Sequence, residues 1–187
     1  EKKAIINNIE DYMKAPKKKS GSLDDSKYDF FYFTYYESGK WCTEGNGPAS
    51  VGACQPGIEH GAGICQWTTM TSGLENIQIL CGKLAELDSN LCGSLAKYAD
   101  VDSVTLINKY AMQPTFEDSY LKRDFKAIAE RDRDRFLELQ MQIALEEKYQ
   151  TFDDLDLSWM KERPAVVQGT LGSLVNWGPY MGWESAI

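Results

Sequence analysis

The sequence predicts a mainly α-helical domain of the α+β class, a helical bundle around a long central helix with a small loop or β region beside it. Three observations support this fold class. The chain has 187 residues, which is about the size of one domain. Apolar side chains recur at helical spacing over residues 116–149 and in shorter stretches after residue 74. Between residues 39 and 63, seven glycines and two prolines indicate loops instead.

Residues 1–22 are predicted to form an N-terminal helix and linker that precede the main domain, residues 23–187. Apolar residues from Ile5 to Met13 lie at helical spacing, and Pro16 with the lysines after it breaks the pattern. Residues 24–36 are dense in Tyr and Phe, which predicts a buried element. Ser26 as an N-terminal cap favours a helix there, whereas the aromatic residues equally favour a strand.

The loop-rich span ends at a short apolar run, Ile64–Trp67, which we expect to form a strand. The spacing of apolar residues after it predicts helices over residues 74–87, 91–98 and 104–110. A further helix is expected to begin at Pro164 and to continue through Val175.

The long periodic stretch carries two charges on its apolar stripe. Steps of four and three residues from Ile128 reach Asp132 and Arg135, so we expect these two side chains to face the interior. A charge in a core needs a partner, because a stranded one costs several kcal/mol. We therefore expect a structural ion-pair network here rather than catalytic groups.

The charge balance argues against a nucleic-acid partner, because phosphates need a concentrated basic surface. The net charge is -8; residues 1–22 carry six lysines and three acids, or +3, so residues 23–187 carry -11. No apolar run is long enough to span a membrane. A single histidine, His60, and the lack of a phosphate-binding glycine motif predict no metal and no cofactor.

Five cysteines without a CxxC motif leave two short disulfides as a hypothesis, Cys42 with Cys54 and Cys81 with Cys92, with Cys65 as a buried thiol. Such a pairing fits an exported protein, and five reduced cysteines fit a cytosolic one. Because the chain begins at Glu1 rather than Met, we expect it to be part of a larger protein.

Three carboxylic acids near the loop-rich span are candidates for acid–base chemistry. Glu37 ends the aromatic run, where we expect burial to raise the pKa of its carboxyl, so that it can protonate a glycosidic oxygen. Glu59 precedes a glycine-rich segment, in which the backbone can approach a ligand closely, and Glu44 competes with it as the second carboxylate.

Two motifs, Glu37-Ser38-Gly39 and then GAGICQWT at residues 61–68, resemble the lysozyme-like superfamily, especially goose-type lysozymes, lytic transglycosylases and phage-tail lysozymes. Residues 125–135 and then 166–178 are similar to the long central helix and the following helix of its chitosanase branch. The resemblance covers about residues 24–183 in order. It departs from the family at Glu59, where goose-type and chitosanase relatives usually have Asp.

The resemblance implies a muramidase that cleaves β-1,4 bonds between the amino sugars of peptidoglycan, with a cleft beside the small β region. Glu37 would be its general acid and Glu59 its general base, and the pair implies inversion. Residues expected to contact the glycan are Trp41, Gly63, Gln66, Trp67 and Thr68. The implied setting is a secreted antibacterial effector or a phage lysin that reaches the periplasm or wall of a target cell, with an immunity protein as the partner of an effector.

Three alternatives stay open at this stage. Chitosan, a cationic polymer, suits the acidic residues 23–187 and would make the protein a chitosanase. A non-catalytic glycan-binding module would keep the fold without the chemistry. A cysteine peptidase would use His60, otherwise expected to be an ordinary loop histidine, with Cys54 or Cys65. Gln66 and Trp67 also fit a role in core packing.

Overall fold

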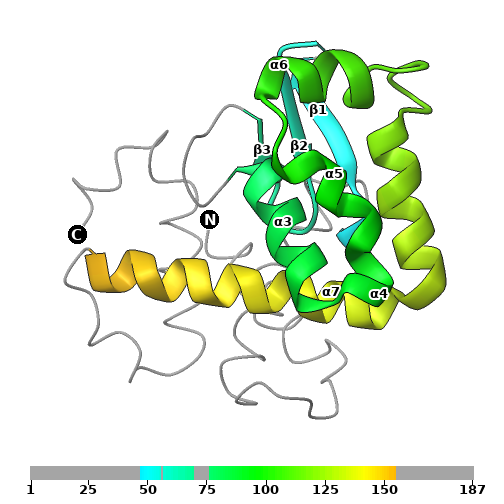
Figure 1. Cartoon of the computed structure of the whole chain (residues 1–187). Helices are drawn as coiled ribbons and strands as arrows, with labels where there is room; N and C mark the ends of the chain where they lie inside the picture. The colour runs from blue at the N-terminus through cyan, green and yellow to red at the C-terminus, as the bar shows by residue number, and fades with distance from the viewer. Residues whose placement is uncertain (1–46, 56, 70–75, 155–187) are drawn as a thin grey trace, which may run out of the picture.

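The computed structural model describes residues 47–55, 57–69 and 76–154, which form a small sheet followed by helices (Figure 1). This part of the chain is mostly helical, as the sequence predicts. The predicted elements over residues 4–15 and 24–36, the linker between them and the helix from Pro164 lie outside the described residues.

Three short antiparallel strands make the sheet: β1 (Val51–Gln55), β2 (Glu59–Ala62) and β3 (Trp67–Thr68), in the order β1-β2-β3. Val51 pairs with Ala62 and Gln55 with Glu59, and the register shifts between Gly52 and Gln55. A short 3-10 helix, η1 (Gly47–Ala49), precedes β1.

The expectation of loops over residues 39–63 is therefore wrong for the described part of that span, which contains η1, β1 and β2. Apart from Val51, the residues of β1 and β2 are small or polar and have little strand propensity of their own. Their strand conformation comes from pairing with each other and from packing against the helices. The strand expected over Ile64–Trp67 is wrong for its first three residues, which belong to a turn, and β3 begins only at Trp67.

The first helix expected after the sheet is confirmed, and the next two are divided into shorter elements. Helix α3 (Ile77–Leu87) is capped by Asn76, whose side chain accepts hydrogen bonds from Gln78 N and Ile79 N. Five short elements replace the two helices expected over residues 91–110. They are α4 (Ser89–Cys92), η2 (Gly93–Leu95), α5 (Ala96–Ala99), α6 (Ser103–Thr105) and η3 (Leu106–Ala111), the last a π-helix.

Helix α7 (Tyr120–Asp154) is the predicted long helix, and it is kinked at Asp132. Asp132 has φ -157° and ψ 90°, outside the helical region, and its Oδ1 accepts a hydrogen bond from Arg135 N at 2.9 Å. The side chain thus caps the second half of α7 as an N-cap residue does. Figure 1 shows the two halves of α7 running in clearly different directions.

The expected inward orientation of Asp132 is wrong, because the kink leaves this side chain exposed. Arg135 is half-buried and pairs with two carboxylates, Asp88 Oδ2 at 3.3 Å and Glu138 Oε2 at 3.0 Å. The hydrogen bond from Leu91 N, and secondarily Arg135, hold the pKa of Asp88 below its ordinary value. Arg135, but not Asp132, therefore belongs to an ion-pair network, which ties α7 to the junction of α3 and α4.

The core lies between the sheet, α3 and both halves of α7. Phe125 and Phe136, on opposite sides of the kink, meet edge to face with ring centroids 5.6 Å apart. The largest fully buried side chains are Trp67, Tyr98, Phe125, Phe136, Ile64, Ile77, Leu80 and Leu84. Within the described residues, no helix is both long enough and apolar enough to cross a membrane.

The predicted disulfide between Cys81 and Cys92 is wrong, because both thiols are free and fully buried. Burial raises the pKa of the Cys92 thiol to about 12 and raises that of Cys81 further still. Cys65, expected to be a buried thiol, is half-buried. Cys42 and the side chain of Cys54 lie outside the described residues, so their predicted pairing stays a prediction.

Candidate functional site

The turn between β2 and β3 carries most of the described residues that the sequence singles out. Gly63 opens this turn with φ +71°, a conformation that favours glycine. A Cβ at Gly63 would lie 2.6 Å from Gln140 Oε1 and 3.1 Å from the Trp67 ring. The predicted glycan contact at Gly63 is therefore also a position where the fold itself requires glycine.

Gln140 of α7 holds this turn in place, and the sequence analysis missed it. Its Oε1 accepts a hydrogen bond from Ile64 N at 3.0 Å, and its Nε2 donates to Pro48 O at 2.8 Å. The side chain is fully buried, so both bonds are shielded from water. One amide thus joins η1, the β2–β3 turn and α7. The only sequence signal was a polar residue beside the apolar stripe of a long helix.

Gln66 is the one described residue other than glycine with a positive φ, +55°. Its N–H donates to Gly63 O at 3.3 Å, which closes the turn. The side chain is half-buried over the glycines, with Oε1 3.0 Å from where a Cβ of Gly61 would be. Strained backbone of this kind is common at functional sites. The glycan contact expected of Gln66 fits this half-exposed position.

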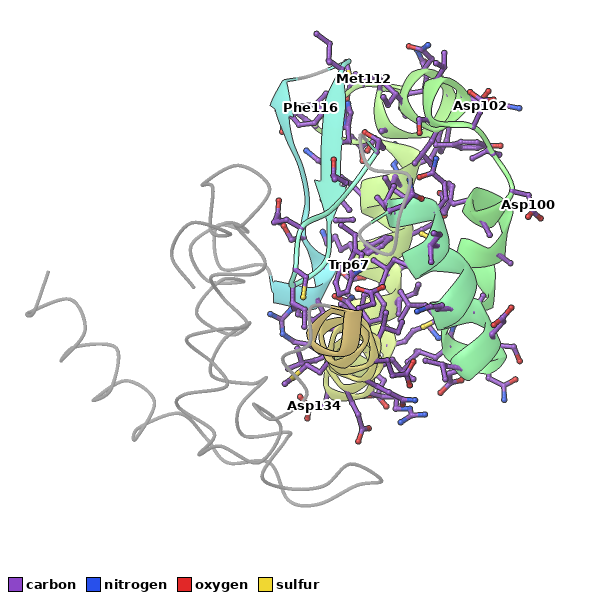
Figure 2. All side chains as sticks on the ribbon, turned by 90° about the vertical axis from the view of Figure 1, so that its left-hand side faces the viewer. Trp67, Asp100, Asp102, Met112, Phe116 and Asp134 are labelled. Atoms are coloured by element: carbon purple, nitrogen blue, oxygen red, sulfur yellow. The ribbon has the colours of Figure 1, made fainter. Side chains whose placement is uncertain are left out.

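Trp67 serves the core rather than a surface. Its side chain is 1 % exposed, and Nε1 donates to Glu147 Oε2 at 3.0 Å. Figure 2 shows Trp67 where the sheet meets α7. The ring faces have no room for a sugar, so the packing alternative is the correct one for Trp67. Thr68 follows in β3 opposite Gly61 and is half-buried.

His60 lies within β2 and is fully buried, so the expectation of a loop histidine is wrong. Nε2 accepts a hydrogen bond from Gly57 N at 3.2 Å, which places the ring proton on Nδ1, and Nδ1 has no partner among the described residues. The ring meets Phe116 edge to face at 5.8 Å. Burial, and secondarily the charge of Lys122, lowers the pKa of His60. Because Gly57 occupies Nε2, this nitrogen is not available to activate a thiol.

The predicted carboxyl pair is not part of the described structure. Glu37, Glu44 and Trp41 lie outside the described residues. Glu59 is the first residue of β2 and pairs with Gln55 of β1, but its side chain lies outside the described part as well. The described chain therefore brings together Gly63, Gln66 and Thr68 around one turn, with the backbone of Glu59 on the strand that leads into it.

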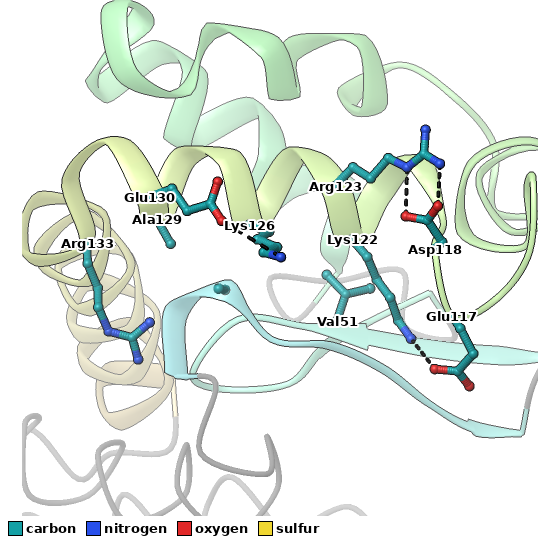
Figure 3. Close-up of a pocket in the computed structure, with 10 residues that line it drawn as sticks. Val51, Glu117, Asp118, Lys122, Arg123, Lys126, Ala129, Glu130 and Arg133 are labelled. Atoms are coloured by element: carbon teal, nitrogen blue, oxygen red, sulfur yellow. Dashed lines mark hydrogen bonds and ion pairs between the residues drawn. The ribbon is translucent and has the colours of Figure 1, made fainter.

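A groove of about 560 Å³ lies on the other side of the sheet edge, between β1 and the first half of α7 (Figure 3). This volume is in the range of small-molecule sites. The residues that line it are Ala49, Val51, Glu117, Asp118, Lys122, Arg123, Lys126, Ala129, Glu130 and Arg133. No group of three or more His, Cys, Asp or Glu side chains that could hold a metal ion occurs among the residues that the structure describes.

Comparison of the chain with protein-family models, with curated proteins and with solved structures found no match. The functional argument therefore depends on the motifs of the sequence and on the described geometry.

Proposed function

We propose that this chain is a peptidoglycan-degrading glycoside hydrolase, a muramidase that cleaves β-1,4 bonds between amino sugars. Glu37 acts as the general acid and Glu59 as the general base that activates water. Neither a cofactor nor a metal takes part in this scheme.

One observation carries the proposal: the lysozyme-like motif at residues 61–68 coincides with a specialised turn beside a small sheet. The turn needs glycine at position 63, and Gln66 adopts a positive φ with a half-exposed side chain. Glu59 begins the strand that enters this turn. A rigid turn is suited to position a sugar, because catalytic groups and substrate contacts need a fixed geometry.

The experiment is digestion of purified peptidoglycan by the native chain and by Glu37→Gln, with the products identified by mass spectrometry. The native chain should release disaccharide-peptides with reducing ends, and Glu37→Gln should release fewer by a factor of about 10² or more. Glu86→Gln is a matched control, because Glu86 is exposed on α3 and the substitution makes the same chemical change. Products that persist undiminished in Glu37→Gln would refute the role of Glu37.

The second carboxylate is tested in the same assay by comparing Glu59→Gln with Glu44→Gln. If Glu59 is the general base, Glu59→Gln loses turnover and Glu44→Gln does not. The reverse result would assign the role to Glu44. Anhydro sugar products would instead indicate a lytic transglycosylase, which needs no second catalytic carboxylate.

Two alternatives stay in the test. The net charge of -8 favours a cationic polymer, so chitosan is digested in parallel. Reducing oligomers from chitosan alone would make the protein a chitosanase. A non-catalytic glycan-binding module would give no products from either polymer, and its affinity for glycan would be the same in Glu37→Gln.

The proposed setting is an antibacterial cell-wall-lysing toxin or lysin domain, secreted or delivered to the periplasm of a target cell as part of a larger protein. In an effector, a cognate immunity protein would bind over the glycan site. Co-purification with a candidate inhibitor, followed by loss of wall digestion, tests this.

A further inference from the structure

The groove between β1 and the first half of α7 carries a row of cations. Lys122 and Lys126 line it from the first half of α7, four residues apart, and Arg133 lines it from just beyond the kink at Asp132. Residues four apart project from the same side of a helix. From Lys122 to Lys126 the helix rises about 6 Å. The small side chain of Ala129 leaves room between the cations (Figure 3).

Three carboxylates also line the groove, and they differ in how firmly they are engaged. Arg123 donates hydrogen bonds to both carboxylate oxygens of Asp118, so these two side chains form a bidentate ion pair with each other. Glu117 lies 3.6 Å from Lys122 Nζ and is 85 % exposed. Glu130 lies 3.8 Å from Lys126 Nζ and is 67 % exposed. Long, exposed pairs of this kind contribute little to stability, so a better anion can displace both glutamates.

Lys122 is held in place before any ligand arrives. Its Nζ lies 3.8 Å from the centroid of the Phe116 ring, and its side chain is only 22 % exposed. The guanidinium of Arg133, which is exposed, lies near Gly47, where a Cβ would be 2.9 Å from Nη2. Fixing the long side chain of Lys122 in advance lowers the entropy that binding would cost.

The net charge of the groove is opposite in sign to that of residues 23–187 as a whole. Residues 23–187 carry a net charge of -11, yet the groove has four cations and three carboxylates, or +1. Such a surface repels an anionic polymer everywhere except where cations gather, so the groove would select the place where the polymer binds.

We propose that this groove binds carboxylate groups of an anionic glycan, the peptidoglycan strand with its stem peptides attached. The lactyl and stem-peptide carboxylates of the strand replace Glu117 and Glu130 as partners of Lys122 and Lys126. The inference rests on the proposed function and adds the form of substrate that is preferred, because the cations of the groove would repel chitosan.

The test measures binding of the full chain in the Glu37→Gln background, so that no substrate is consumed. The probes are purified sacculi, the same glycan stripped of stem peptides by an amidase, and chitosan oligomers. Lys126→Glu is the principal variant, because Lys126 is 74 % exposed and its loss should not affect folding. Lys109→Glu is the control: it makes the same charge change at an exposed lysine of η3 that does not line the groove.

The expected result is a Kd for sacculi about tenfold higher for Lys126→Glu than for Lys109→Glu, since one charge-assisted contact is worth about that factor. The difference should shrink on stripped glycan and disappear at high salt. Equal affinities of the two variants for sacculi, or no binding of sacculi by the parent chain, would overturn the inference. So would tighter binding to chitosan than to sacculi.

The same preparations separate this inference from the muramidase proposal, because digestion is measured independently with the native Glu37 chain. Binding of sacculi that depends on Lys126, without digestion, would support the role of the groove and refute the proposed hydrolase activity. Digestion of sacculi with equal binding by Lys126→Glu and Lys109→Glu supports the hydrolase and refutes the groove.

Discussion

Replacing Gln140 by Ala is the strongest test of how the β2–β3 turn is held. The substitution removes two buried hydrogen bonds, one from Ile64 N and one to Pro48 O. Each group left without a partner costs about 1–3 kcal/mol, so we expect the free energy of unfolding to fall by roughly 2–5 kcal/mol. Few single substitutions of a polar residue destabilise a protein that much, since most cost about 1 kcal/mol.

Urea unfolding followed by tryptophan fluorescence measures the effect. With an m-value of about 2 kcal/mol/M, the midpoint should fall by roughly 1–2.5 M. Gln142→Ala is the matched control: it lies two residues further along α7, and its side chain donates a hydrogen bond to exposed Glu146. We expect that control to shift the midpoint little. A Gln140→Ala midpoint within error of the Gln142→Ala midpoint would refute the role of Gln140 in holding the turn.

Three further predictions address the turn, the kink and the buried histidine. Gly63→Ala should lower the free energy of unfolding by about 1–3 kcal/mol through backbone strain. The loss should be smaller in the Gln140→Ala background, because the new Cβ would meet the Gln140 side chain, and a double-mutant cycle by urea unfolding measures this coupling. Asp132→Ala should lower the free energy of unfolding by about 1 kcal/mol, because the second half of α7 loses its cap, whereas Asp134→Ala, at an exposed neighbour, should not. Thermal unfolding compares the two variants, and equal losses of stability would contradict the capping role. Burial lowers the pKa of His60 and so favours its neutral form. The free energy of unfolding should therefore be highest above pH 6.5 and should fall as the pH drops below it, by at most about 1.4 kcal/mol per pH unit. Urea unfolding from pH 7.5 to 5 tests this, and the same slope in His60→Gln would exclude the histidine as its cause.

Local patterns in the sequence predicted most of the helical structure. The apolar spacing over residues 74–87 and 116–149 predicted the helices found as α3 and α7, since a helix that buries one face must repeat its apolar residues with the helical period. The same spacing placed Asp132 inside the core, because periodicity assumes an unbroken helix. The kink made by Asp132 itself invalidates that assumption.

The candidate site was predictable only in its local part. Residues 61–68 stand out in the sequence as a motif, but the sequence predicts a strand over Ile64–Trp67. Only the structure shows that residues 63–66 form a turn, with a positive φ at Gln66 and a requirement for glycine at position 63. The roles of Glu37 and Glu59 stay predictions. Trp67 was assigned to glycan as readily as to the core, because an aromatic side chain suits both environments.

The sequence by itself determined the periods of the long helices and the contrast in charge between the first 22 residues and the rest. Only the tertiary structure decided that β1 and β2 pair, that Gln140 reaches Ile64 across 76 residues, and that Lys122 and Lys126 face β1 across a groove. The physical reason is that a helix or a turn follows from interactions between residues close in the chain. A buried hydrogen bond, a strand pair or a groove depends on partners that only folding brings together.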